Sequence, residues 1–374
     1  MKWKPILNKE AAAVVYDILY KIAKALSSEK DGKEKNSLMY GNFGKIIFLE
    51  NLYDLSKENE FDEKASDIFS DIHQTTMQEI YDSISLNTLQ SLDFSFDKGL
   101  SGIGWGVNYL IRNSFLEGDI NDVMSLVDAN IYRQMIGKMH QLNTDSFNVS
   151  ISNGKYAVCR GGRLVEEYMH RFITEFYDLK NQYHELYKSE NGRVDDVARL
   201  IFFLQNIEAK YKFEETQELL DMFCTLLHSK LTQFSEVKLQ HLFAWFTLYG
   251  SVLHKKNIES LLSDNYDMLI TQADRLSLNS GLQNGLVFTG HIANRFYQTN
   301  NNIKVCKDIS IKCFNLMLEK LYSSHGQNEF EGWSTASQML WGIHNNFYNG
   351  LSGIGLALMS AISGNQPDWD ESIC

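Results

Sequence analysis

Two stretches of the sequence carry nearly the same nine residues. The first runs from Phe96 to Gly104 and reads Phe-Asp-Lys-Gly-Leu-Ser-Gly-Ile-Gly. The second runs from Phe347 to Gly355 and reads Phe-Tyr-Asn-Gly-Leu-Ser-Gly-Ile-Gly, so seven of the nine positions are identical. Such a match is very improbable by chance, and the chain is therefore predicted to be built from a repeated structural unit.

Weaker copies of the motif give the length of this unit. Tyr40 to Ile46 follows the same pattern ahead of the first strong motif, and Gly285 to Gly290 follows it ahead of the last. The spacings indicate a period of about 60 residues, with a further copy at Cys159-Arg-Gly-Gly162. The copy expected near position 223 is missing, and its nearest substitute, Trp245 to Gly250, is displaced.

The period fits a pair of helices with their loops, since two helices of roughly 15–20 residues fill about 60 residues. Apolar residues recur at helical spacing after the glycines, which predicts helices over 99–112 and 351–362. The two prolines, Pro5 and Pro367, lie near the ends, so the interior lacks the commonest helix breaker. The chain is predicted to be all-α and, without a linker-like segment, a single domain over residues 1–374.

Glycine clusters at helix starts have two interpretations. Glycine lets helix ends approach closely and lets the backbone turn, which is a packing role. Exposed amides at helix N-termini also favour anions. If the repeats close into a ring, these loops gather at one end of it and surround the mouth of a central cavity.

These motifs resemble those of the lanthionine synthetase C-like family. The resemblance runs from Tyr40 to Trp369, is closest in the second and last motifs, and includes the ending Leu-Ala-Leu-Met-Ser-Ala-Ile-Ser-Gly-Asn-Gln-Pro-Asp-Trp-Asp. It implies an α/α toroid of six to seven helical pairs, with an inner ring of helices inside an outer ring. The glycine motifs would then lie at the starts of the inner helices.

The resemblance also implies a chemistry, the cyclisation of ribosomally made peptides. In that family a substrate cysteine thiol adds to dehydroalanine or dehydrobutyrine and forms a thioether ring. A zinc ion held by two cysteines and a histidine stabilises the thiolate nucleophile at neutral pH. The ligands come from a Trp-Cys-x-Gly motif and from a later Cys-His-Gly motif.

This sequence departs from both ligand motifs. Gln283 and Asn284 occupy the Cys-His position before Gly285, and amide side chains are poor zinc ligands. Trp245 is followed by Phe246 instead of cysteine. The sequence therefore predicts that the family's zinc site is absent and that no cofactor is bound, unless another zinc site exists.

The remaining cysteines offer few alternatives. The five are Cys159, Cys224, Cys306, Cys313 and Cys374, and no Cys-x-x-Cys pair occurs. Cys224 and His228 are four residues apart and would share a helical face, which is a weak alternative metal site. Cys159, beside Arg160, has a second interpretation as a reactive thiol of lowered pKa.

The repeat register selects polar residues that precede the glycine motifs as candidate substrate contacts at the cavity mouth. They are hydrogen-bonding groups, for which helix capping and loop solvation are the alternative roles. Arg160 is the member best suited to an acidic peptide or a carboxylate. The full set is Asp97, Lys98, Arg160, Gln283, Asn284, His344, Tyr348 and Asn349. No catalytic residue is identified.

Charge and hydropathy limit the partners. The formal net charge of −12 disfavours nonspecific nucleic-acid binding. The chain has no apolar run long enough to span a membrane and does not open like a signal peptide, so we expect a cytoplasmic protein. The expected partners are a precursor peptide, a peptide-modifying enzyme, or both.

Three functions remain open at this point. The first is a zinc-less accessory or peptide-binding protein of lanthipeptide-type maturation. The second is an active lanthionine cyclase that accelerates ring closure by positioning the reacting groups. The third is an α/α-toroid glycosidase that uses paired carboxylates among Asp93, Asp97 and Glu331, with Trp333 stacking on a sugar.

Overall fold

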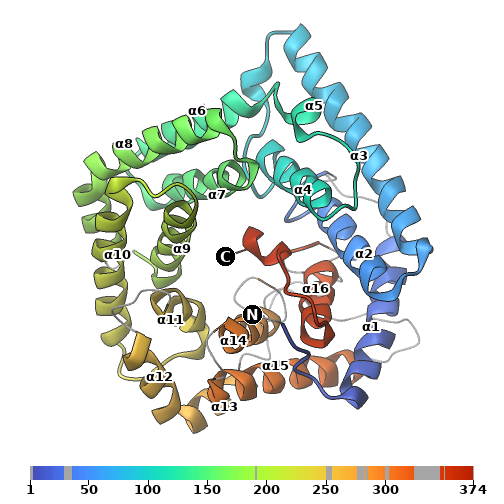
Figure 1. Ribbon diagram of the computed structural model, residues 1–374, viewed down its shortest axis with the longest axis vertical. Coiled ribbons are helices and arrows are strands. Elements are labelled where there is room, and N and C mark those ends of the chain that lie inside the picture. Colours follow the sequence, from blue (N-terminus) through green and yellow to red (C-terminus); the bar gives the residue numbers. More distant parts are fainter. Residues whose placement is uncertain are drawn as a thin grey trace. The chain divides into compact units, whose positions relative to one another are not determined.

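A computed structural model of the chain shows only helices and connecting segments in the residues that it describes (Figure 1). Within these residues it contains sixteen α-helices, three short 3-10 helices and no strand, and no helix there is long and apolar enough to cross a membrane. The described residues are 3–28, 36–189, 192–249, 255–275, 282, 285–299, 303–323, 346–348 and 350–373.

The chain forms two compact units, each made of several sequence segments. Unit 1 comprises Met1–Gln78, Lys238–Leu242 and Glu259–Trp369. Unit 2 comprises Glu79–Val237, Phe243–Ile258 and Asp370–Cys374. The single domain predicted for residues 1–374 stays a prediction.

Unit 2 consists of two layers of helices that pack against each other (Figure 1). In one layer α7 lies between α4 and α9, and in the other layer α8 lies between α6 and α10. Their bounds are α4 Leu100–Arg112, α6 Asp128–Met139, α7 Thr144–Arg160, α8 Arg163–Lys188, α9 Val194–Lys210 and α10 Glu214–Thr232. The unit also contains η1 Leu89–Ser91, α5 Ile120–Met124 and most of α11 Leu242–Tyr249.

Unit 1 has the same two-layer construction. In one layer α16 packs against α2 and α14, and in the other α15 packs against α1 and α13. Their bounds are α1 Lys9–Ser28, α2 Phe43–Ser56, α13 Tyr266–Arg275, α14 Leu286–Thr299, α15 Lys304–Ser323 and α16 Leu351–Ile362. Most of α3 Asn59–Ser85 and η2 Leu239–His241 also belong to this unit, whereas α12 Lys255–Asp264 and η4 Trp369–Ser372 each cross a boundary between the units.

The two strong glycine motifs begin helices, as the sequence predicts. Gly99 caps α4 with φ −116° and ψ −161°, and Gly350 caps α16 with φ −123° and ψ −169°. The near-identical backbone angles show that the shared motif encodes one local structure. Every residue of α16 is buried, so this helix forms part of the core of unit 1.

The third glycine cluster both ends one helix and begins the next. Gly161 and Gly162 follow the end of α7 with φ of +63° and +94°, which are backbone angles that favour glycine. The helix itself begins at Thr144, where the Asn143 side chain accepts a hydrogen bond from the backbone amide of Ser146 at 2.8 Å. Gly162 is also the N-cap of α8 (Arg163–Lys188), so a helix does start after this cluster, although with a positive φ that Gly99 and Gly350 do not share.

Aromatic side chains fill the space between the two layers of unit 2. Phe147 on α7 stacks with Tyr183 on α8, with ring centroids 4.0 Å apart. Phe176 on α8 also contacts Phe147, at 4.8 Å, and stacks with Phe223 on α10 at 5.7 Å. All four side chains are fully buried. This large apolar contact fixes the position of α7 relative to α8.

Candidate functional site

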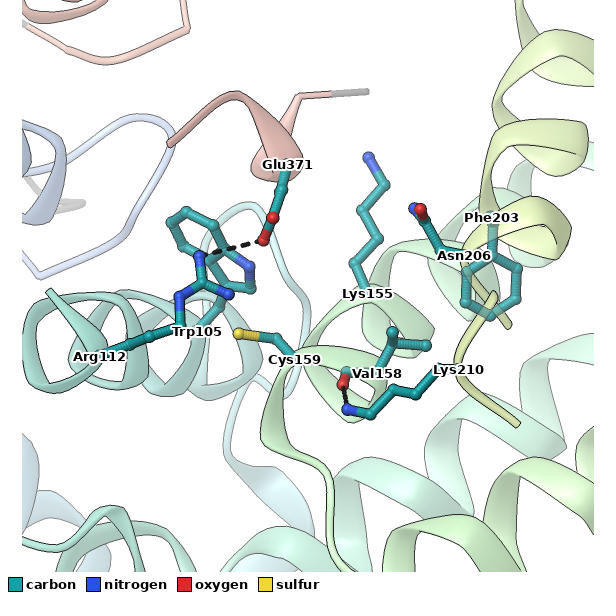
Figure 2. A pocket seen from close by; sticks show the side chains of 9 residues that line it. All are labelled: Trp105, Arg112, Lys155, Val158, Cys159, Phe203, Asn206, Lys210 and Glu371. Atoms are coloured by element: carbon teal, nitrogen blue, oxygen red, sulfur yellow. Dashed lines mark hydrogen bonds and ion pairs between the residues drawn. The ribbon is translucent and has the colours of Figure 1, made fainter. Parts of the chain in front are cut away.

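A cavity of about 230 Å³ lies within unit 2 (Figure 2). Helices α4, α7 and α9 and the turn η4 supply its walls. Trp105 and Phe203 form aromatic parts of the wall, and most of the other lining side chains are polar or charged. The described lining residues are Trp105, Arg112, Lys155, Val158, Cys159, Phe203, Asn206, Lys210 and Glu371.

Helical spacing explains why these side chains converge. Lys155 and Cys159 are four residues apart on α7, as are Asn206 and Lys210 on α9, so each pair projects from one helical face. Trp105 and Arg112 are seven residues apart and share a face of α4. Since α7 packs against both α4 and α9, three such faces meet at the cavity.

Close contact between α7 and α9 sets one wall. Gly154 lies so near the ring of Phe203 that an added Cβ would be 2.4 Å from its Cζ atom. Only glycine permits this approach without displacing the ring. The position of the Phe203 side chain in the cavity wall therefore depends on the glycine at 154.

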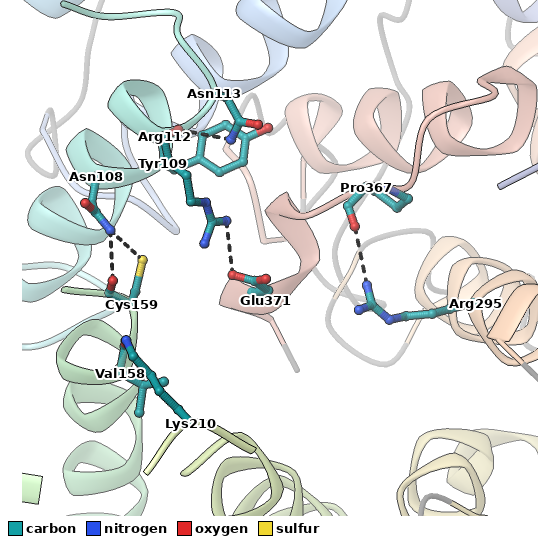
Figure 3. Close-up of polar contacts among 10 residues, drawn as sticks. All are labelled: Asn108, Tyr109, Arg112, Asn113, Val158, Cys159, Lys210, Arg295, Pro367 and Glu371. Atoms are coloured by element: carbon teal, nitrogen blue, oxygen red, sulfur yellow. Dashed lines mark hydrogen bonds and ion pairs between the residues drawn. The ribbon is translucent and has the colours of Figure 1, made fainter. Parts of the chain in front are cut away.

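The cationic side chains of the cavity interact with acceptors near the ends of helices. Figures 2 and 3 show the pair of Arg112 and Glu371. Arg112 pairs with Glu371 at 3.1 Å, and Lys155 Nζ donates to the backbone carbonyl of Ser372 at 3.3 Å. Lys210 Nζ donates to the carbonyl of Val158 near the end of α7. Basic groups at helix C-termini are stabilised by the unsatisfied carbonyls there.

Burial and charge both change the titration of these groups. Burial lowers the pKa of Lys210, and the nearby Arg112 lowers it further, while the neighbouring Cys159 and Glu371 oppose this change. Burial also raises the pKa of Cys159, against the hydrogen bond from Asn108 at 2.9 Å to its sulfur. The thiol is therefore held protonated at neutral pH, which disagrees with the alternative of an activated nucleophile at this position.

Asp97, one of the predicted site residues, lies close enough to the cavity to interact with it. Burial among protein atoms raises the pKa of its carboxyl, although the side chain keeps contact with solvent. The charges of Lys155 and Arg199 oppose that rise. Asp97 and Lys98 both precede the start of α4, and Lys98 donates its backbone amide to the Ser95 hydroxyl at 3.4 Å.

Arg160 has partners of its own outside the cavity lining. Its guanidinium donates to Asp128 on α6 at 3.2 Å and to Asn121 on α5, and the Tyr156 hydroxyl donates to the same Asp128 carboxylate. Burial raises the pKa of Asp128, while the Tyr156 hydroxyl and Arg160 oppose that rise. The structure gives Arg160 a role in joining helices, and its predicted contact with a carboxylate ligand stays a prediction.

Tyr348 belongs to unit 1 and links three segments of it. Its backbone amide donates to the carbonyl of Met39 at 3.1 Å, and its own carbonyl accepts from the amide of Leu282 at 2.9 Å. Its ring contacts Tyr40 edge-on at 6.0 Å. The other predicted site residues lie outside the described residues: Gln283, Asn284, His344 and Asn349.

The described residues contain no set of side chains of the kind that the family resemblance implies for zinc. In the described part of the chain no group of three or more His, Cys, Asp or Glu residues could hold a metal ion. Cys224 is buried on α10 with His228 one turn further along, so this pair lacks further protein ligands of those types there. Burial raises the pKa of Cys306 and of Cys313 to about 12, so both stay thiols within α15.

The acids considered for glycoside hydrolysis do not form a described pair. Asp93 is engaged in a local turn, where its Oδ1 accepts from the Ser95 amide at 2.7 Å. Glu331 and Trp333 lie outside the described residues. Hydrolysis needs two carboxyl groups on opposite sides of a bond, and Asp93 and Asp97 come from the same short loop.

Sequence comparison finds no matching family model and no matching curated protein. A solved structure of a nisin cyclase is nevertheless similar to this chain, with a TM-score of 0.60 and 12% sequence identity. The match covers 98% of this chain and 98% of that one. It shows the fold, and the predicted fold class, an all-α chain of α/α toroid type, is confirmed.

Sequence reasoning missed most residues of the cavity. Arg112, Lys155 and Lys210 lie within or at the ends of helices and not in the loops before the glycine motifs. A usable signal was present, because polar residues four apart on otherwise apolar helices mark a face that is not simply core. Asn108 and Arg112 on α4 follow the same pattern.

Proposed function

We propose that the protein takes part in lanthipeptide-type peptide maturation as a zinc-less, peptide-binding accessory protein. The observation that carries this proposal is the nisin cyclase fold over nearly the whole chain. Fold alone does not fix function, so the residues at the expected site decide between an active and an accessory role.

Those residues favour binding over catalysis. Gln283 and Asn284 stand where the related motif has cysteine and histidine, and Phe246 follows Trp245 where it has cysteine. None of these three side chains is a usual zinc ligand. A scaffold that keeps its helical frame without the ligands is suited to holding a peptide for another enzyme.

Binding to a precursor peptide tests the proposal. The tag-free protein is titrated by calorimetry with a lanthipeptide precursor, with and without a lanthipeptide-modifying enzyme. Binding at micromolar concentration that a scrambled peptide does not reproduce is the expected result. Absence of binding to both the peptide and the enzyme would contradict an accessory role.

Cyclisation without zinc is a second candidate, because the fold match is to a protein whose name describes a cyclase. The substrate thiol would add across the double bond of a dehydro residue, so that sulfur bonds to the β-carbon and the α-carbon gains the proton. Positioning both groups in one site can supply a large part of the rate increase. A dehydrated peptide should then close its rings faster, with altered stereochemistry, in the presence of the protein and a chelator.

Equal ring yield and stereochemistry with and without the protein would remove this second candidate. The peptide-binding measurement is unaffected by that outcome. The two experiments therefore separate an accessory protein from a cyclase.

A further inference from the structure

The cavity of unit 2 already contains a short piece of acidic chain. The turn η4 places the Glu371 carboxylate at Arg112 (Figures 2 and 3). It also places the Ser372 carbonyl at Lys155. A side-chain carboxylate and a backbone carbonyl from adjacent residues are the groups that any acidic peptide presents. The contacts that η4 makes are thus ones that a separate acidic peptide would also make.

The described lining of the cavity contains more cationic than anionic side chains. It has three cationic side chains, Arg112, Lys155 and Lys210, against the one carboxylate of Glu371. Asp97 offsets part of the charge at Lys155. This lining is thus rich in cationic side chains, in a chain whose net charge is −12.

The ion pair between Arg112 and Glu371 is one in which a ligand carboxylate can take the place of Glu371. Both side chains keep contact with water, with exposed fractions of 40% and 44%. Ion pairs at such exposure contribute little to stability because water screens them. An incoming carboxylate can therefore replace Glu371 at Arg112 with little loss to the fold.

We propose that this cavity binds a carboxylate-bearing segment of an acidic peptide and that Glu371 is the intramolecular group which the ligand displaces. Arg112 recognises the ligand carboxylate through its planar pair of donors, and Lys155 donates a hydrogen bond to the adjacent backbone carbonyl. The aromatic walls formed by Trp105 and Phe203 contact the apolar side chain next to the acid. The proposed function supplies the class of ligand, a peptide, whereas the site follows from the cavity itself.

Size limits the ligand to a short segment. A volume of about 230 Å³ is below that of a typical pocket for a drug-sized molecule. It suits one acidic side chain with its backbone and part of a neighbour. The remainder of the peptide would run outside the cavity.

The test uses the full-length protein and a synthetic peptide with the chain's own sequence Asp-Trp-Asp-Glu-Ser-Ile, from Asp368 to Ile373. Calorimetric titration at low salt compares this peptide with one in which Asn and Gln replace the three acids. The acidic peptide is expected to bind about tenfold more tightly, because hydrogen bonds to charged groups are the strong ones. The Glu371→Gln variant should bind it about threefold more tightly than the unchanged protein, since the internal competitor is weakened.

Arg112→Gln should reduce the affinity for the acidic peptide about tenfold. The matched control is Arg163→Gln on α8 of the same unit, where the side chain is 93% exposed and pairs only locally with Glu167 at 3.4 Å. That variant should bind as the unchanged protein does. Lys155→Gln is the second cavity variant, used if circular dichroism shows that Arg112→Gln is unfolded.

Equal affinity for the acidic and neutral peptides would overturn the proposal, as would equal losses in Arg112→Gln and Arg163→Gln. Unchanged or weaker binding by Glu371→Gln would show that Glu371 is only a structural tether.

If a whole precursor binds and Arg112→Gln leaves its affinity unchanged, the site is wrong and the proposed function stands. If the acidic probe binds through Arg112 and no precursor binds, the proposed function is wrong and the site stands.

Discussion

Glu50 on α2 carries a carboxyl group that is unusual in its surroundings. Only 3% of the residue is exposed, and its Oε2 has no hydrogen-bond partner among the described residues. Burial raises the pKa of Glu50 from 4.5 to about 8, and the nearby Asp62 raises it as well. The carboxyl is therefore largely protonated in the folded protein at neutral pH.

This raised pKa predicts a specific pH dependence of stability. The folded state keeps the Glu50 proton up to about pH 8, whereas the unfolded chain loses it near pH 4.5. Between these values the folded state binds more protons, so the contribution of Glu50 to stability falls as pH rises and then levels off. Urea unfolding of Glu50→Gln and of the unchanged protein at several pH values should show a difference that grows from pH 5 to about pH 8 in favour of the variant. Parallel curves would contradict a buried, protonated Glu50.

Arg160 shows the opposite situation, a charge that is buried with its partners. It pairs with Asp128 at 3.2 Å where their side chains are only 11% and 10% exposed. Arg160→Met should destabilise the protein by about 3 kcal/mol, because Asp128 loses its compensating charge.

The matched control for this change is Arg171→Met. Arg171 pairs with Glu175 at 2.5 Å, but its side chain is 63% exposed, so its loss should destabilise the protein much less than the loss of Arg160. Chemical unfolding measures both variants. Similar losses in the two would show that burial does not distinguish these ion pairs.

The helices differ in how far the sequence predicts them. The starts of α4 and α16 are predicted correctly, since Gly99 and Gly350 adopt the same extended conformation before the same motif. The copy at Gly161 and Gly162 is predicted less completely, because Gly161 ends α7 while Gly162 caps the start of α8 with a positive φ. Glycine serves both ends of helices, and only the dihedral angles distinguish the two uses.

The cavity shows a second limit of sequence reasoning. Its residues are brought together by the packing of α4, α7 and α9, which spacing within one helix does not specify. The repeat predicted a site in the glycine loops, and of that set Asp97 interacts with the cavity through Lys155. Periodicity therefore predicts the faces of helices, while tertiary packing decides which faces meet.

The close contact between α7 and α9 leads to a prediction about stability. Gly154→Ala should destabilise the protein by about 1–3 kcal/mol, because its Cβ would press on the rigid ring of Phe203. Gly137→Ala on α6 is the control, since nothing lies within 4 Å of the added atom, and it should be neutral or stabilising by up to about 1 kcal/mol. Thermal unfolding measures both. A loss in Gly137→Ala as large as in Gly154→Ala would contradict the packing argument.

For the whole molecule, the residues that determine the fold are different from those that determine the chemistry. The fold corresponds to that of a nisin cyclase at 12% identity, which means that most surface and many core residues differ while the helical frame is shared. The repeated glycine motifs and the apolar faces that follow them account for that frame. The zinc ligands are a separate set of residues, so a chain can keep the frame without them.

Because the helical frame does not depend on zinc ligands, we predict that the folded protein binds no zinc. Protein purified without chelator should contain much less than one zinc per chain by elemental mass spectrometry, also after exposure to excess zinc and dialysis. A chelator should then leave the thermal unfolding midpoint unchanged, because metal that binds only the folded state would raise it. One tightly held zinc per chain would contradict the accessory role and favour the cyclase.

The arrangement of the cavity side chains separates what the site recognises from what holds the protein together. Lys155, Asn206 and Lys210 stand on helices whose other faces carry the apolar core. Exchanging such side chains alters recognition while the buried faces stay intact. The same frame can then acquire preferences for acidic, basic or neutral peptides through a few substitutions, which makes the cavity a natural starting point for redesigning what the protein binds.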